Sequence, residues 1–154
     1  MTLEKLKEYL DSQGIKYIVI SHSLAYTSQE IAQSAHIPAR QLAKTVIVSI
    51  DGKMCMAVLP ASYKVDLHLL RDITGAKKVE LATEDEFAAM FHGCEVGAMA
   101  PFGNIYGMGV YVSDLLAAQE EIAFNACSHR ELVKMAFADY AKLVQPKIME
   151  FAEL

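Results

Sequence analysis

Lys44 is the first residue whose type and position suggest chemistry. It opens an apolar run, Lys44-Thr-Val-Ile-Val-Ser-Ile50. Lysine is depleted in strands, and burying an ammonium group is costly unless the group is paired. One interpretation is a solvated lysine at the end of a strand. The other is a cation that points into a cleft and binds a phosphate or carbonyl oxygen.

A glycine-rich stretch over residues 93–109 is the second candidate. It begins Gly-Cys-Glu-Val-Gly-Ala-Met-Ala-Pro-Phe-Gly. Glycine lets backbone N–H groups approach a ligand closely, and successive amides can bind an anion or stabilise an oxyanion. No Gly-Lys-Ser/Thr follows, so the stretch is not a Walker loop, and Pro101 conflicts with a GxGxxG motif that opens a helix. A tight structural loop explains the glycines equally well.

Histidines and cysteines are weaker candidates. His22 follows a predicted strand and His129 lies in a predicted first helical turn, so either could bind a substrate, although lone histidines are more often locally satisfied. The histidine spacing predicts no metal site. The three cysteines are widely separated and include no CxxC pair, which indicates a reducing compartment, most simply the cytoplasm. Cys94 is expected to be a buried core residue.

Apolar patterns predict the elements that would position these residues. A helix is expected from Leu3 to Leu10, ended by Gly14, and Asp51-Gly52 predicts a hairpin turn. Strands are predicted over the following residues: 17–21, 42–50, 53–59, 110–112 and 122–125.

Capping patterns predict the remaining helices. They are expected over 28–35 after Thr27, through Arg71 after Asp66, and through Phe91 after Thr83. A Ser128–Glu131 capping box predicts a further helix with Leu132, Met135 and Ala136 on one face. Because helices and strands do not alternate regularly, we expect an α+β fold with a mixed, largely antiparallel sheet.

Composition and charge bound the class of protein. The chain has 154 residues, of which 53% are hydrophobic and 21% charged, so we expect one globular domain over residues 1–154. No apolar stretch reaches the about 18 residues of a membrane helix, and the N-terminus lacks a signal-peptide pattern. A net charge of −5 excludes a general coat protein for nucleic acid, including DNA.

Taken together, these motifs resemble the YbaK family of aminoacyl-tRNA deacylases, which is related to the editing domain of bacterial prolyl-tRNA synthetases. The resemblance spans residues 1–145 and rests on an ordered set of segments: Lys44-Thr-Val-Ile-Val, the loop from Gly93 to Gly103, Ile105-Tyr-Gly, Val110-Tyr-Val-Ser-Asp114 and Cys127-Ser-His-Arg. It implies a barrel-like sheet flanked by helices.

The resemblance also implies an activity that needs no metal and no cofactor. The ester between a wrong amino acid and the 3′ end of a tRNA would be hydrolysed, with alanine or cysteine on a proline tRNA as the expected substrate. A synthetase could be a second partner, and neither DNA nor a membrane is expected. The protein is expected to be a monomer or homodimer.

Roles carry over residue by residue. The family's lysine falls on Lys44 and its GxxxP loop on residues 97–101, so catalytic roles are expected for Lys44, Gly97 and Ala98. Substrate contacts are expected from a larger set: His22, Tyr26, Thr27, Met99, Ala100, Pro101 and His129. Two departures bear on pocket shape. Ala100 stands where many relatives have proline or serine, and Cys127 stands where glycine is common.

Other interpretations remain beside this one. A non-catalytic module could bind an aminoacyl-tRNA end or a synthetase. A regulatory DNA- or RNA-binding protein is disfavoured by the acidic charge and the absence of a helix-turn-helix signature. The apolar tail, residues 146–154, is expected to pack on the body rather than form a dimer contact.

The net charge conceals a local asymmetry. Residues 40–78 carry a net charge of +4, so the remainder carries −9. A basic segment around Lys44 is typical of a protein that contacts only the phosphates near an RNA end. Ordinary solvated charge is the alternative.

Overall fold

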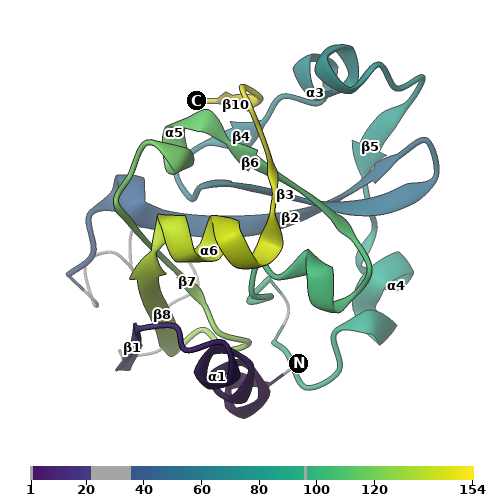
Figure 1. Cartoon of the computed structure of the whole chain (residues 1–154). Helices are drawn as coiled ribbons and strands as arrows, with labels where there is room; N and C mark the ends of the chain where they lie inside the picture. The colour runs from purple at the N-terminus through teal and green to yellow at the C-terminus, as the bar shows by residue number, and fades with distance from the viewer. Residues whose placement is uncertain (1, 22–35, 96) are drawn as a thin grey trace.

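A mixed sheet organises the part of the chain that the computed structural model describes, residues 2–21, 36–95 and 97–154 (Figure 1). Its strand order is β1-β8-β7-β2-β3-β6-β9, and β5 pairs with β2. The strands are β1 (Tyr17–Ser21), β2 (Leu42–Ile50), β3 (Lys53–Pro60), β5 (Val79–Leu81), β6 (Gly109–Ser113), β7 (Glu121–Asn125), β8 (Glu131–Ala136) and β9 (Lys147–Met149).

Most pairings within this sheet are antiparallel. Strand pairs β1–β8, β7–β8, β2–β3 and β2–β5 run antiparallel, whereas β2–β7, β3–β6 and β6–β9 run parallel. The predicted α+β class with a mixed, largely antiparallel sheet is therefore confirmed. A second, two-stranded sheet joins β4 (Lys64–Val65) to β10 (Ala152–Glu153).

The hairpin between β2 and β3 forms as predicted. Asp51 and Gly52 both have positive φ, 50° and 86°, as a two-residue hairpin turn requires. The Asp51 carboxylate also accepts hydrogen bonds from the N–H groups of Lys77 and Lys78 at 2.9 to 3.3 Å. The turn therefore fixes the start of β5 as well as the register of β2.

Helices flank the sheet. They are α1 (Leu3–Ser12), α3 (Leu67–Thr74), α4 (Glu84–Phe87), α5 (Asp114–Ala117) and α6 (Phe137–Val144), with 3-10 turns η1 (Ala39–Gln41), η2 (Ala88–Met90) and η3 (Gly103–Ile105). The predicted caps Asp66 and Thr83 are confirmed. The helix after Thr83 is shorter than predicted, because it tightens into η2. The helix predicted over 28–35 lies outside the described residues.

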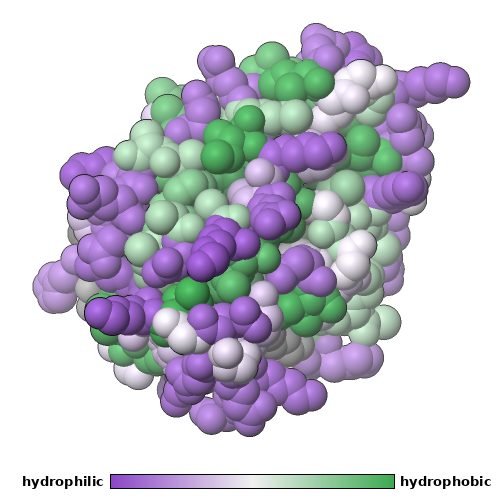
Figure 2. Space-filling model, in the orientation of Figure 1, coloured by the Kyte–Doolittle hydropathy of each residue, from purple (hydrophilic) through white to green (hydrophobic). Residues whose placement is uncertain are grey.

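Apolar clusters lie on both faces of the sheet. Along β2, Ala43 and Ile47 join a large cluster with side chains of α1 and α6, whereas Val48 joins a cluster that includes Leu70 of α3. This division follows from the alternation of side chains along a strand. Figure 1 shows α6 lying across the sheet and α1 beneath it. Hydrophilic residues gather over the lower rim, where α1 lies (Figure 2).

The prediction of a helix from the Ser128–Glu131 pattern is wrong. Ser128 does donate a hydrogen bond to the Glu131 carboxylate, at 3.3 Å, but the chain continues as strand β8. Side chains of β8 are buried on both faces, Val133 in the cluster under α6 and Leu132 in a cluster on the other face. A strand buried on both sides has no period-2 polarity, so its apolar run could be mistaken for a helical face.

The tail packs on the body of the protein. β9 extends the sheet beside β6, and Phe151 is fully buried in the α3-side cluster. Asp66, the cap of α3, donates its backbone N–H to the Phe151 carbonyl at 2.7 Å. Among the described residues, no helix is long and apolar enough to cross a membrane.

Candidate functional site

Lys44 lies where two central strands separate. β2 and β7 run parallel, but they pair only at Leu42↔Ala123 and Ala43↔Phe124, one residue short of Lys44. The cross-strand partner of Lys44 on the other side is Leu59 of β3. Lys44 is thus the third residue of a central strand, and no residue of β7 pairs with it.

The environment of the Lys44 ammonium disfavours its charge. The residue is half-buried, and within the described part of the chain it has no hydrogen-bonding or ion-pair partner. Desolvation, followed by repulsion from Lys64, lowers the pKa of Lys44 from its ordinary value of 10.5. A desolvated cation beside a second cation favours an anionic or strongly polar ligand.

Glu95 and Ala98 of the glycine-rich stretch hydrogen-bond to Cys127, just beyond the end of β7. The Cys127 N–H donates to the Ala98 carbonyl, and the Glu95 N–H donates to the Cys127 carbonyl, both at 2.9 Å. Cys127 is three residues beyond Phe124, at most about 10 Å along the chain. The structure therefore brings the loop close to the point at which β2 and β7 separate beside Lys44.

The loop offers particular backbone donors. The Ala98 N–H is used within the loop, since it donates to the Glu95 carbonyl at 3.1 Å. Met99 and Ala100 are buried, and among the described residues their N–H groups have no acceptor. Two successive buried amides of this kind can hold an oxyanion. Gly97 is exposed and has a φ of 80°, which suits glycine.

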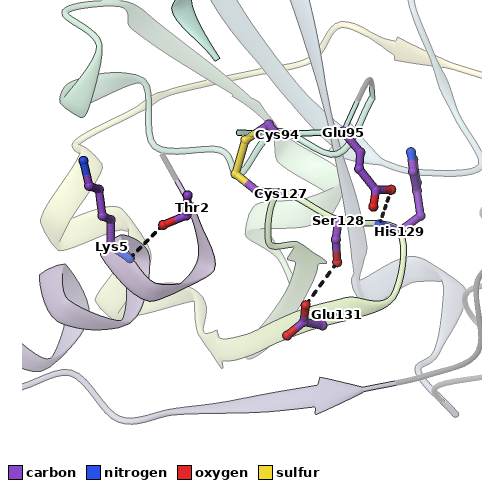
Figure 3. Close-up of a disulfide and its surroundings, with 8 residues drawn as sticks. All are labelled: Thr2, Lys5, Cys94, Glu95, Cys127, Ser128, His129 and Glu131. Atoms are coloured by element: carbon purple, nitrogen blue, oxygen red, sulfur yellow. Dashed lines mark hydrogen bonds between the residues drawn. A yellow bond between two sulfur atoms is a disulfide. The ribbon is translucent and has the colours of Figure 1, made fainter. Parts of the chain in front are cut away.

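His129 and Glu95 connect the two sides of the loop region. His129 is buried, and its imidazole Cε1 would lie 3.9 Å from a Cβ built on Gly97. Its backbone N–H donates to the Glu95 carboxylate at 3.1 Å (Figure 3). His129 is therefore placed beside Gly97, whereas the predicted substrate contacts His22, Tyr26 and Thr27 lie outside the described residues.

A disulfide joins the same two segments. Cys94 and Cys127 are 33 residues apart and are covalently linked (Figure 3). Cys94 packs against the core cluster, as expected, but the prediction did not include its disulfide, because sequence spacing does not reveal pairs formed by the fold. Cys55 is free. The cysteines consequently no longer support a reducing compartment.

An aromatic cluster holds the far end of the loop. Phe102 is fully buried against the rings of Tyr9, Phe124 and Tyr140 at centroid distances of 5.4 to 6.0 Å. The buried Tyr140 hydroxyl donates to the Pro101 carbonyl at 2.6 Å. These contacts position residues 97–101 from the large core cluster.

Changing Tyr140 to phenylalanine should destabilise the protein. The change leaves the buried Pro101 carbonyl without its donor, at a cost of about 1–3 kcal/mol in unfolding free energy. Chemical denaturation measures the loss. Tyr17→Phe is the matched control, because the Tyr17 hydroxyl donates to Asp11 at an exposed site and its removal should cost less. Equal losses in the two variants would contradict the anchoring role of Tyr140.

Asn125 is a site residue that the motif analysis missed. It directly follows Phe124, the last residue of β7 that pairs with β2, and so lies across the separation from Lys44. Its Oδ1 atom is buried and lacks a hydrogen-bond partner in the described part of the chain. The only signal in the sequence is a polar residue that ends the apolar run Ile-Ala-Phe, which is too common to be diagnostic. No cluster of three potential metal ligands occurs among the described residues.

Comparisons with known proteins find relatives that are connected with tRNA aminoacylation and its editing. The family model for the aminoacyl-tRNA editing domain matches residues 22–143. The multifunctional Ser/Thr-tRNA deacylase ProXp-y of Escherichia coli K12 is 26% identical over 98% of this chain and 93% of its own length. A proline–tRNA ligase of Bacillus cereus is 28% identical over 65% of this chain but 17% of its own length.

Solved structures support the fold. One described provisionally as a trans-editing enzyme for prolyl-tRNA synthetase superposes with a TM-score of 0.83, covering 99% of this chain and 97% of the other. Its sequence identity is 17%, so the likeness concerns the fold alone.

Proposed function

Because the chain belongs to the aminoacyl-tRNA editing domain family, we propose that Lys44 and the amides of residues 99 and 100 form its deacylation centre. The activity is that of an aminoacyl-tRNA deacylase, a hydrolase that removes a wrong amino acid from tRNA. The observation that carries the site is the half-buried Lys44 ammonium, unpaired within the described residues, at the point where β2 and β7 separate.

The reaction does not need a nucleophilic side chain from the protein. An aminoacyl ester is already activated, so a positioned water and a polarised carbonyl suffice. The water oxygen bonds to the carbonyl carbon, the N–H groups of Met99 and Ala100 receive the developing oxyanion, and the C–O bond to the ribose breaks. The departing ribose oxygen takes a proton from the attacking water. The other hydroxyl of the terminal ribose positions that water. Lys44 binds the adjacent phosphate or the ester carbonyl.

The remaining predicted residues are assigned to substrate binding. Gly97 and Ala98 form the turn that presents the two amides, and His129 lies beside Gly97. Pro101 fixes the end of the loop through its bond with Tyr140. A pocket bounded by a rigid loop excludes large side chains, but it discriminates only modestly between groups that differ by one methylene.

A small aminoacyl group is the proposed substrate, and the alanyl and cysteinyl esters of proline tRNA are those that the family resemblance implies. The relative named as a Ser/Thr-tRNA deacylase adds serine and threonine to the set to be tested. The test is to incubate the protein with tRNAs charged with each of the four amino acids and to measure release of the amino acid. Turnover above the uncatalysed rate on any of them supports the proposal, and turnover on none contradicts it.

Phosphate contacts of the tRNA are assigned to the basic segment. Arg71, Lys77 and Lys78 line a cavity of about 220 Å³ between α3 and β5, with His68 on its wall. Lys44 lies six residues before the β2 residue that pairs with Val79, about 20 Å along the strand. The spacing suits contacts to several phosphates of one RNA strand. We assign no oligomeric state.

Deacylation should fall at alkaline pH when Lys44 loses its proton. Desolvation lowers the pKa of Lys44, so this fall should begin below the pH at which an ordinary lysine titrates. Lys64→Ala removes the second cause of the shift and should move the fall to higher pH. The measurement is kcat/KM against pH after subtraction of uncatalysed hydrolysis. An unmoved profile in Lys64→Ala would contradict the coupling.

The same shift has a consequence for stability. Because the folded-state pKa of Lys44 lies below its unfolded value, burial of the charged form costs stability at neutral pH. That cost is full below the lowered pKa, decreases as the pH rises above it, and is gone above the unfolded-state pKa. A charged side chain whose burial costs stability is typical of a functional position.

A non-catalytic binding module is the alternative. It would bind the aminoacyl-tRNA end without releasing the amino acid, and the deacylation panel separates the two cases.

A synthetase partner is proposed because part of a proline–tRNA ligase resembles this chain. The cytoplasm is the proposed place of action because aminoacyl-tRNA is used there.

A further inference from the structure

Asn125 shares a face of the sheet with Lys44. Leu42 and Ala123 are opposite each other, so their side chains point to the same side. Two residues further along each strand, Lys44 and Asn125 point to that side as well. β2 and β7 stop pairing just before these residues, so the two side chains lie on either side of the point where the strands separate.

The Asn125 carboxamide is left without a partner. Its Oδ1 is buried, and no hydrogen bond joins either end of the group to another described residue. A buried carbonyl oxygen that lacks a hydrogen-bond donor costs free energy, and native proteins retain few of them. Ligand binding is a physical reason to keep one at this position.

Apolar side chains lie on the same face of the sheet as the Asn125 carboxamide. Leu132 is its cross-strand partner, and it clusters with Ala123, Leu42 and Ile37 on the same face. Asn125 is thus a hydrogen-bonding group at the end of a small apolar surface. Lys44, on the neighbouring strand β2, provides a positive charge that can bind a phosphate or polarise an ester carbonyl.

We propose that Asn125 is a specificity-determining residue that hydrogen-bonds the side-chain hydroxyl of a seryl or threonyl ester, while the adjacent apolar cluster contacts its carbon atoms. This inference rests on the proposed function and names the substrate class of that site. A hydroxyl both donates and accepts, so it satisfies either end of the carboxamide. A substrate side chain that ends in an ammonium group is disfavoured, because Lys44 already places positive charge on this face.

The energetics favour selection by hydroxyl. A site built to hydrogen-bond a hydroxyl rejects an analogue without it, because the polar group of the site is then left unpaired. Alanyl ester is that analogue of seryl ester. We therefore expect the protein to prefer the seryl ester to the alanyl ester by about tenfold or more in kcat/KM.

The test compares wild-type protein with Asn125→Leu, which keeps the approximate size and removes the hydrogen bonds. Seryl, threonyl and alanyl esters of one tRNA are used. The seryl and threonyl values of kcat/KM should fall about tenfold, and the alanyl value should change less than about twofold. Asn125→Asp, which keeps an acceptor, should retain more of the seryl preference than Asn125→Leu.

Two further readouts make the result decisive. Thermal unfolding should show Asn125→Leu at least as stable as wild type, since no protein hydrogen bond is lost. Binding of non-hydrolysable 3′-seryl- and 3′-alanyl-amide adenosine should show the same preference without turnover. An unchanged seryl-to-alanyl ratio, or equal loss on both, overturns the role of Asn125. Absence of turnover by wild type, with the seryl analogue still preferred, overturns only the deacylation proposal.

Discussion

Replacing Lys44 by alanine is expected to reduce deacylation by about 100- to 1,000-fold while leaving the fold intact. The ammonium is the candidate site's cation, and it has no ion-pair partner among the described residues, so its removal breaks no salt bridge. Removal also relieves the cost of burying a charge. Single-turnover rates on a substrate found in the tRNA panel, with a thermal unfolding curve for each variant, measure both effects.

Two matched variants sharpen the Lys44 result. Lys53→Ala removes an exposed lysine from the neighbouring strand and should leave the rate within about twofold. Lys44→Arg keeps the charge but changes its geometry, so it should recover part of the activity. Full activity in Lys44→Ala on a true substrate would refute the assigned role, and equal loss in Lys53→Ala would indicate a general charge effect instead.

Phe102→Ala is expected to have the largest effect on stability, about 3–5 kcal/mol of unfolding free energy. The ring is fully buried and contacts three other aromatic rings, so its loss leaves a cavity at the end of the loop. Activity should fall too, because Met99 and Ala100 lose their support. Urea denaturation gives the stability change, and deacylation at low temperature gives the activity of the folded fraction.

Ile105→Ala is the control within the same segment. Ile105 is 40% exposed, so its truncation should cost much less than that of Phe102. Phe102→Leu refills most of the cavity and should recover part of the stability. A small cost in Phe102→Ala would mean that the loop is held by its hydrogen bonds alone.

The features that sequence predicted well are those determined by nearby residues. The Asp51-Gly52 turn, the Asp66 cap and the Thr83 capping box each depend on contacts within a few positions. The loop of residues 97–101 could be found because glycine permits backbone conformations that other residues avoid and proline fixes φ. Its hydrogen bonds to residues after β7 could not be predicted from local patterns.

The features that sequence missed depend on distant partners. β8 is a strand because it pairs with both β1 and β7, and this outweighs the local Ser128–Glu131 pattern. The bond between Cys94 and Cys127, and the placement of Asn125 on the same face as Lys44, likewise require the strand order. Family resemblance predicted the sheet class, but it gave no account of the unpaired carboxamide.

The short pairing between β4 and β10 has a consequence for protein engineering. Lys64, whose charge adds to desolvation in lowering the pKa of Lys44, lies opposite Glu153, one residue before Leu154. An affinity tag fused after Leu154 would therefore adjoin the strand that carries this lysine. A tag before Met1 would leave that pairing untouched, so the two fusions provide a means to test whether the β4–β10 pairing tunes the charge at Lys44.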